Sequence, residues 1–197
     1  MKLIVATNNQ GKVREFSRIL SPLGFEVTSL KDEGIVSDPE ETGATFAENA
    51  RIKAKAVFDK AHCACVADDS GLSVDALGGA PGVYTARYAG VGATDVENNA
   101  KLLKDMEDIP ENERKAEFKC ALCMILENGE EIAVQGECRG VIADSPRGNG
   151  GFGYDPLFLV GEHSYAELSS EQKDSISHRG NALKALVREL NLRKIQR

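Results

Sequence analysis

The first third of the chain alternates short apolar runs with segments of helical spacing. Residues 3–6 form an uninterrupted apolar run that predicts a buried strand, and residues 12–20 carry apolar side chains three and four positions apart, as a helix does. Residues 25–30 predict a second strand, residues 46–61 a long Ala-rich helix, and residues 64–67 a third buried strand. This alternation indicates a mixed α/β fold.

The second half of the chain contains a different signal. Asn128-Gly129 lies between apolar runs at residues 117–126 and 131–138, and this dipeptide is the strongest short-range sign of a β-hairpin. Helical spacing predicts a helix over residues 94–106 and a final helix over residues 175–190. We therefore expect antiparallel strands beside the early strand and helix alternation.

Composition and charge exclude several classes of protein. The chain has 197 residues, with 24 Lys and Arg against 31 Asp and Glu and a formal charge of −7, so no broad basic surface for nucleic acid is expected. A hydrophobic fraction of 42% suits a globular core. The apolar run at residues 3–6 leads straight into Thr7, so neither a secretory signal nor a membrane span is predicted, and we expect a cytoplasmic protein with no membrane partner.

The cysteines do not indicate a disulfide framework. They are odd in number and lie in strand-like segments, at positions 63, 65, 120, 123 and 138. A zinc site built from His62, Cys63, Cys65, Cys120 and Cys123 is an alternative. Buried, small apolar side chains are favoured over it, because Cys120 and Cys123 would point to opposite faces of one strand.

A polar loop between the first strand and the first helix is the first candidate for chemistry. It consists of Thr7, Asn8, Asn9, Gln10, Gly11 and Lys12. Free backbone N–H groups and the helix dipole favour an anion at a helix start, so the loop predicts a phosphate cradle. It is not a Walker A loop, because Ala6 replaces the first glycine and Val13 follows the lysine. The alternative is a polar turn with a surface lysine.

Two pairs of acidic residues are candidates for metal binding. Asp68 and Asp69, followed by Ser70, are expected directly after the third strand, where adjacent side chains point in different directions. One carboxylate can then ligate a metal, and carboxylates suit magnesium. The alternative is an Asp-Ser-Gly turn. Glu40 and Glu41, ahead of the long helix, would supply a further ligand or only favour the helix N-terminus.

A glycine-rich segment at residues 148–153 formally matches G-x-G-x-x-G. It is followed by Pro156 and an apolar run rather than by a helix, so the dinucleotide-binding context is missing. A better use of the segment is to present Phe152 and Tyr154 for stacking on a base, with Asp155 as a hydrogen-bond acceptor. The alternative is a connector with ordinary core aromatics.

Basic residues near the start of the last helix are a further candidate group. They are Lys173, His178 and Arg179. Lys and Arg near a helix N-terminus oppose the helix dipole, a local cost that is easier to explain if an anion or a carbonyl-bearing ligand binds. Lys53 on the long helix is ambiguous, because lysines on a helical face are usually only solvated.

These motifs follow one another along the chain as Thr7-x-Asn9-x-x-Lys12, the run from Glu40 to Lys53, Asp68-Asp69-Ser70-Gly71, Gly78-Gly79-x-Pro81-Gly82, Phe152-Gly153-Tyr154-Asp155 and Ser177-His178-Arg179. Together they resemble the inosine triphosphate pyrophosphatase family, the dITP/XTP diphosphatases, nearly end to end. The resemblance implies an elongated, two-lobed α/β protein with a mixed sheet and a central substrate cleft. It also implies that residues 1–197 form a single domain and that the protein is a homodimer.

The resemblance further implies hydrolysis of ITP, dITP and XTP to the monophosphate and pyrophosphate, with Mg²⁺ as cofactor. Asp69 would be the catalytic base and a metal ligand, with Asp68 and one of Glu40 or Glu41 completing the carboxylate cluster. The implied substrate-binding residues are Thr7, Asn8, Asn9, Gln10, Gly11, Lys12, Lys53, Ser70, Phe152, Gly153, Tyr154, Asp155, Lys173, His178 and Arg179.

Specificity and rival functions follow from the same residues. Arg179 or His178 donating to the 6-oxo group of the base would reject adenine, because adenine leaves that donor unpaired. A nucleotide-binding sensor without turnover is one rival, and the acidic cluster argues against it. A metal-dependent phosphatase is another, and its product would be orthophosphate instead of pyrophosphate.

Overall fold

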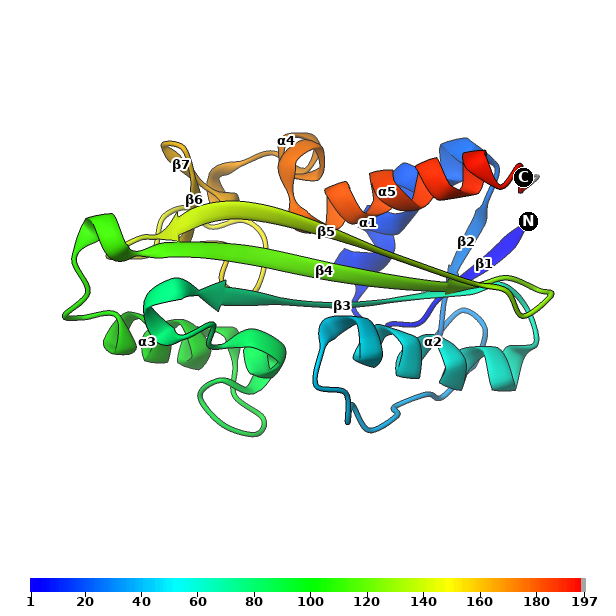
Figure 1. The fold of residues 1–197 in the computed structure, drawn as a ribbon, viewed down its shortest axis with the longest axis horizontal. Coiled ribbons are helices and arrows are strands. Elements are labelled where there is room, and N and C mark those ends of the chain that lie inside the picture. The colour runs from blue at the N-terminus through cyan, green and yellow to red at the C-terminus, as the bar shows by residue number, and fades with distance from the viewer. Residues whose placement is uncertain (196–197) are drawn as a thin grey trace. The chain divides into compact units, whose positions relative to one another are not determined.

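The computed structural model describes residues 1–195, and within them helices flank one open, mixed sheet (Figure 1). The sheet has seven strands in the order β2-β1-β3-β4-β5-β6-β7 over these residues. They are β1 (Lys2–Val5), β2 (Glu26–Ser29), β3 (Cys65–Val74), β4 (Lys115–Ile125), β5 (Glu131–Ile142), β6 (Phe158–Val160) and β7 (His163–Ser164). β1 pairs in parallel with β2 and β3, whereas β6 is antiparallel to β5 and β7. The predicted α/β class with a mixed sheet is confirmed.

Several of the main helices begin where the local sequence supplies a cap. The main helices are α1 (Gln10–Leu20), α2 (Phe46–Ala61), α3 (Asp95–Asp105), α4 (Ser170–Ile176) and α5 (His178–Leu192). Asn9 caps α1, while Thr45 and Thr94 form capping boxes at the starts of α2 and α3. The helix predicted over residues 46–61 is confirmed at both ends.

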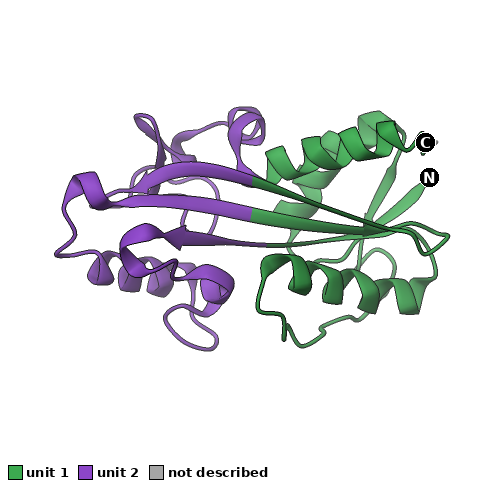
Figure 2. Ribbon diagram, in the orientation of Figure 1, with its two compact units in different colours: residues 1–69, 120–136, 179–197 green, residues 70–119, 137–178 purple. Residues whose placement is uncertain are grey.

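The chain divides into two compact units (Figure 2). Unit 1 comprises residues 1–69, residues 120–136 and the chain from Arg179 onward, and unit 2 comprises residues 70–119 and 137–178. Each of β3, β4 and β5 contributes residues to both units. The single domain over residues 1–197 and its central substrate cleft stay predictions.

The core of unit 1 has two apolar clusters that follow the alternation of the strands. Leu3 and Val5 belong to one cluster with α1 and α5, and Ile4 belongs to the other with α2, because successive strand residues point to opposite faces. Cys120 and Cys123 likewise fall into different clusters, as predicted, and all five cysteines are free. Residues 1–195 contain no group of three His, Cys, Asp or Glu suited to a metal, so the zinc alternative is wrong.

The third strand is longer than predicted. The sequence places its end at residue 67, but β3 continues to Val74, so Asp68, Asp69 and Ser70 lie inside a strand and not in a turn after it. The strand tolerates two buried carboxylates because lysine and arginine side chains from other parts of unit 1 reach them. The Asp-Ser-Gly turn is therefore wrong.

The final helix predicted over residues 175–190 is confirmed as α5, but its predicted start is wrong by three residues. α4 ends at Ile176, Ser177 is extended with φ −68° and ψ 156°, and α5 then begins at His178. The apolar spacing continues across this break, so periodicity alone does not reveal it. No helix within residues 1–195 is long and apolar enough to cross a membrane.

Candidate active site

The loop between β1 and α1 is held by its own side chains. The Asn9 carboxamide oxygen accepts the N–H groups of Gly11 at 2.8 Å and Lys12 at 3.2 Å, and Thr7 Oγ1 accepts the N–H of Asn9 at 3.1 Å. These bonds fix the start of α1 and aim Lys12 across unit 1. They also occupy three of the N–H groups expected to cradle a phosphate, so anion binding here depends more on the Lys12 ammonium.

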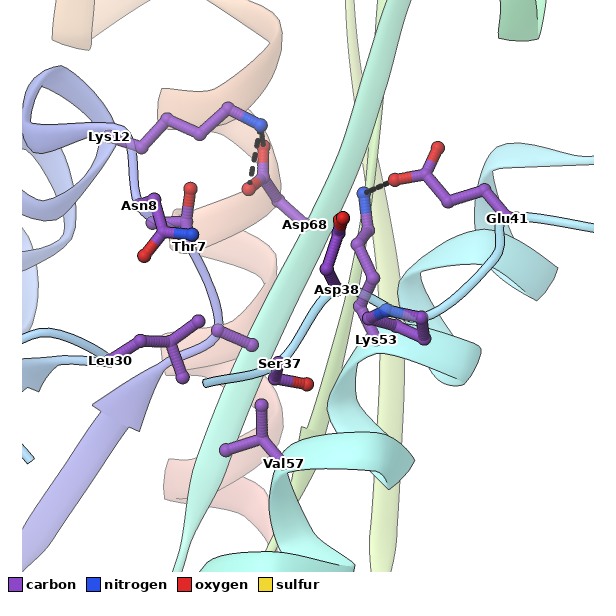
Figure 3. Close-up of a pocket in the computed structure, with 12 residues that line it drawn as sticks. Thr7, Asn8, Lys12, Leu30, Ser37, Asp38, Glu41, Lys53, Val57 and Asp68 are labelled. Carbon is purple, nitrogen blue, oxygen red and sulfur yellow. Dashed lines mark hydrogen bonds and ion pairs between the residues drawn. The ribbon is translucent and has the colours of Figure 1, made fainter. Parts of the chain in front are cut away.

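A cavity of about 200 Å³ lies beside this loop in unit 1 (Figure 3). Its lining comes from the β1–α1 loop, the segment ahead of α2, α2 itself and β3. The polar and charged lining residues are Thr7, Asn8, Lys12, Ser37, Asp38, Glu41, Lys53 and Asp68. Leu30 and Val57 add apolar surface at one end. Residues far apart in sequence are thus brought to one polar cavity.

Asp68 is a buried carboxylate that is firmly ionised. Its side chain lies 2.9 Å from the Lys12 ammonium and 3.3 Å from Nε of Arg179. Burial opposes ionisation, but the charges of Lys12 and Arg179 outweigh it and hold the pKa of Asp68 well below its ordinary value. Asp68 therefore stays negative and keeps both cations in place.

Asp69 lies next to Asp68 in a different environment. Its Oδ1 accepts from the Lys53 ammonium at 2.8 Å and its Oδ2 from the Asn49 amide at 3.3 Å. Burial is the largest influence and raises the pKa of Asp69, and the nearby charge of Glu41 adds to this against the attraction of Lys53. A carboxylate with a raised pKa accepts a proton more readily, which suits a general base.

Lys53 links the acidic residues around the cavity. Its ammonium lies 3.0 Å from Glu41 Oε1 as well as against Asp69, so this α2 lysine is not merely solvated. Glu41 lines the cavity, and Figure 3 shows it turned toward Lys53. Glu40 is exposed, and neither it nor the predicted Gln10 and Gly11 belongs to the lining.

Arg179 belongs to unit 1 and lies deep inside it. The side chain is 3% exposed, and its guanidinium donates to Asp68 and to the buried Glu15 of α1. Burial acts against the charged form, but these two carboxylates raise the pKa of Arg179 above its ordinary value. Its donation to a 6-oxo group stays a prediction, and its contacts indicate that it also holds Asp68.

The remaining predicted site residues lie in unit 2, most of them in or beside the glycine-rich segment. Asp155 is buried, and its Oδ2 accepts from the Lys173 ammonium at 2.5 Å and from the Phe152 N–H at 2.9 Å. The Lys173 ammonium also lies 4.8 Å from the centre of the Phe152 ring. His178 stacks on Phe118 with ring centres 4.6 Å apart. Phe152 is half-buried, and Lys173 and Asp155 place charge and a hydrogen bond beside it.

Tyr154 differs from its neighbour Phe152. It is 4% exposed, packs in the apolar core of unit 2 and donates its hydroxyl to the Thr85 carbonyl at 2.8 Å. A side chain that is buried and bonded in this way anchors the segment. Of the two aromatics expected to stack on a base, Phe152 is therefore the better candidate. Ser70, at the start of unit 2 on β3, is half-buried.

Comparison with known proteins decides the family. The model of the Ham1 family matches residues 3–189. The chain belongs to the Ham1 family. The dITP/XTP pyrophosphatase of Bacillus licheniformis is 51% identical over 187 residues, covering 94% of this chain and 95% of that protein. The Bacillus subtilis protein of the same name is 49% identical over 189 residues, covering 95% and 96%. The predicted resemblance is confirmed.

Solved structures of the Ham1 family have the same fold. The Ham1 protein of Staphylococcus aureus has a TM-score of 0.86 at 40% identity, and the alignment covers 97% of this chain and 98% of that one. A HAM1 protein from Coxiella burnetii has a TM-score of 0.87 at 39% identity, with the same coverage of both chains.

Sequence reasoning missed several residues that this Ham1 family member brings to the site. Glu15 and Asn49 contact Arg179 and Asp69, and Asp38 lines the cavity. Glu15 lies on the buried side of α1, between the apolar Phe16 and the polar loop, and a charged residue at such a position is a usable signal. The sequence around Asn49 gives no comparable sign. An asparagine there is already explained by a local hydrogen bond, in which its side-chain oxygen accepts the Gly43 N–H.

Proposed function

We propose that this protein hydrolyses the non-canonical purine nucleoside triphosphates ITP, dITP and XTP to the monophosphate and pyrophosphate. This activity removes deaminated purines from the pool of nucleotide precursors. The observation that carries the proposal is a pair of adjacent carboxylates, Asp68 and Asp69, each bound to its own lysine beside a polar cavity. The names of the Ham1 relatives agree with this activity.

The lysines of the cavity bind the triphosphate. Lys12 and Lys53 place two ammonium groups at the carboxylate pair, where they neutralise charge on the phosphates and on the departing pyrophosphate. Thr7 and Asn8 add polar groups from the loop between β1 and α1. Asp69 accepts the proton of the water that attacks the α-phosphorus, and its raised pKa suits that role.

The carboxylates also fit a magnesium ion. Mg²⁺ takes oxygen ligands and is usually held by one or two protein carboxylates together with substrate phosphates, so it needs no cluster of three acids. Asp69 would be one carboxylate ligand, and Asp68 or one of Glu40 and Glu41 the second; Glu41 is the glutamate that lines the cavity. When bound, the ion supplies positive charge to the phosphate oxygens and polarises the attacked phosphorus.

The purine binds in unit 2. Phe152 lies against its ring face, and Lys173, His178, Asp155 and Ser70 surround the base and ribose. The Lys173 ammonium already lies against Phe152, so the aromatic ring and a cationic donor are held together in that unit. His178, 5% exposed, would donate to the 6-oxo group that distinguishes hypoxanthine and xanthine from adenine.

The protein acts in the cytoplasm, where its substrates are made, and it is a homodimer. Light scattering at micromolar concentration measures the molar mass, and a value near twice the 21.2 kDa of the chain is expected. A mass equal to that of one chain would contradict the dimer without affecting the activity.

A nucleotide panel tests the activity. The purified protein is incubated with ITP, dITP, XTP, GTP and ATP, with Mg²⁺ or with EDTA, and the first phosphorus-containing products are identified. Pyrophosphate and the monophosphate are expected from ITP, dITP and XTP, and EDTA should stop the reaction. Orthophosphate as the first product would indicate a phosphatase, and tight binding without turnover would indicate a sensor.

A further inference from the structure

Helix α3 holds the peptide groups of Gly153 with two side chains. Asp95 Oδ2 accepts the Gly153 N–H at 2.7 Å, and the Asn99 side-chain amide donates to the Gly153 carbonyl at 2.9 Å. Residues four apart on a helix lie on one face, so Asp95 and Asn99 reach the same residue together. Neither side chain belongs to the predicted site.

The Asp95 bond restricts Phe152, the residue just before Gly153, and the Asn99 bond fixes the peptide plane that follows Gly153. The Phe152 N–H is held by Asp155 at 2.9 Å, and the Gly153 N–H belongs to the next peptide plane, which Asp95 holds. The orientation of a residue's backbone is set by the two peptide planes on either side of its Cα atom. With both planes bonded, the direction in which the Phe152 ring leaves the backbone is fixed.

The segment needs such restraint because its glycines are conformationally free. Gly151 and Gly153 have φ values of +75° and +62°, in the left-handed region. A Cβ atom on Gly151 would lie 2.0 Å from Asp155 Oδ2, so this glycine allows Asp155 to approach Phe152. Without outside bonds, the glycines would leave Phe152 with many orientations.

α3 is a rigid support for these bonds. Thr94 and Glu97 form a capping box at its first turn, and Leu102 is fully buried in the core of unit 2. A side chain on a helix fixed at its start and packed at its end is placed more accurately than one on a loop.

We propose that Asp95 and Asn99 are positioning residues for the base: they hold Phe152 in the orientation that stacks on the purine. This inference rests on the proposed role of Phe152. A ring that is oriented before binding does not have to be ordered by the nucleotide, so loss of the α3 bonds should weaken ground-state binding and leave the chemical step intact.

A fluorescent reporter tests the restraint without any nucleotide. The chain contains no tryptophan, so Phe152→Trp introduces a single indole at the position of interest. In that background Asn99→Ala and Asp95→Ala should each raise acrylamide quenching by about twofold and lower the anisotropy, as for a loosened segment. Unchanged quenching in both variants would overturn the inference.

Asn98→Ala is the matched control. Asn98 is the same residue type on the same helix, but its amide bonds the Ala89 N–H at 2.8 Å and the Ala86 carbonyl at 3.1 Å. Its loss should lower stability without changing the quenching of Trp at position 152. An equal rise in quenching in Asn98→Ala would show that any loosening of α3 suffices, which overturns a specific role for Asp95 and Asn99.

Kinetics test the consequence for the base. In the otherwise unaltered chain, Asn99→Ala and Asp95→Ala should each raise KM for ITP about threefold, less than loss of the Phe152 ring itself, with kcat within about twofold. Asp95→Asn should keep KM near that of the parent, because its amide oxygen still accepts the Gly153 N–H. A fall in kcat at unchanged KM would overturn the inference. If the parent does not hydrolyse ITP, the proposed function fails, while the quenching experiment still decides whether α3 restrains Phe152.

Discussion

The side chains of the polar cavity in unit 1 and of the glycine-rich segment in unit 2 are held in place in different ways. Asp68, Asp69 and Lys53 project from a strand and a helix, and ion pairs orient them. Phe152 projects from a glycine-rich loop, and the carboxylates of Asp155 and Asp95 bond the peptides on either side of it. Charged side chains on a strand and a helix are placed accurately, which suits phosphate chemistry. A loop whose peptides are bonded by side chains from other segments is sufficient to present an aromatic ring to a flat base.

Asp69→Asn should have the largest effect on the unit 1 side of this comparison. Losing a general base commonly costs about 1000-fold in kcat, and the lysines that bind phosphate remain, so the Kd for ITP should stay within about tenfold. Single-turnover kinetics and equilibrium binding measure the two quantities.

Asp59→Asn is the control for this variant. Asp59 is an exposed α2 aspartate paired only with Lys55 among the ion pairs described within residues 1–195, so its loss should leave kcat unchanged. Near-normal turnover in Asp69→Asn would show that the base lies elsewhere, with Asp68 the next candidate.

Asp68→Asn and Asp69→Asn should differ in their free energies of unfolding. Asp68→Asn leaves the charge of the buried Arg179 only partly balanced, which should lower the free energy of unfolding by about 3 kcal/mol. Asp69→Asn removes a carboxylate that burial disfavours, so its free energy of unfolding should be within about 1 kcal/mol of the parent value or higher. Urea denaturation of the nucleotide-free proteins measures both, and equal losses would refute the distinction.

The pH dependence of stability should differ for the same two variants. The folded pKa of Asp68 is lowered, so its contribution is present above the ordinary value of 3.8 and is lost as pH falls through the folded pKa. The destabilisation by Asp68→Asn should therefore shrink in acid. The folded pKa of Asp69 is raised, so its ionisation costs stability as pH rises from 3.8 through the folded pKa. Any gain in Asp69→Asn should grow in that direction, and urea titrations between about pH 3 and pH 7 test both signs.

The smallest effects concern Phe152 and Tyr154 in unit 2. Phe152→Ala should raise KM for ITP by about tenfold, because base stacking on an aromatic ring contributes about 1–3 kcal/mol. Tyr154→Phe should leave KM unchanged and lower the free energy of unfolding by about 1 kcal/mol, since it loses only the bond to the Thr85 carbonyl. A raised KM in Tyr154→Phe would show that Tyr154 contributes to base binding after all.

The sequence predicts well those parts of the fold that are determined by residues adjacent in the chain. The bounds of α2 follow from apolar spacing and from the Thr45 and Glu48 capping box, all within one segment. The length of β3 does not follow in this way, because the cations that allow Asp68 and Asp69 to be buried come from positions 12, 53 and 179. The residues around Asp68 and Asp69 show only two adjacent acids, and such a pair by itself favours a turn over a buried strand.

The candidate site shows the same division. The pattern singles out Lys12 and the aspartates, because they follow predicted apolar strands, whereas Lys53 in the middle of α2 gains its role only from its ion pairs with Asp69 and Glu41. Asp95 and Asn99 are not conspicuous, since polar residues on an exposed helix face are ordinary, and only the distance to Gly153 gives them a role. The division of labour between Phe152 and Tyr154 likewise depends on burial, which two adjacent aromatics do not reveal.

The buried cysteines of the core should resist chemical modification. Burial raises the pKa of Cys65 and Cys120 to about 12 and that of Cys123 to about 11, so at neutral pH almost none of these thiols is a thiolate. Nitrosating and oxidising agents attack thiolates, and nitrosating agents also convert adenine and guanine to hypoxanthine and xanthine. An enzyme with thiols sheltered in this way keeps its core intact under the conditions that create its substrates.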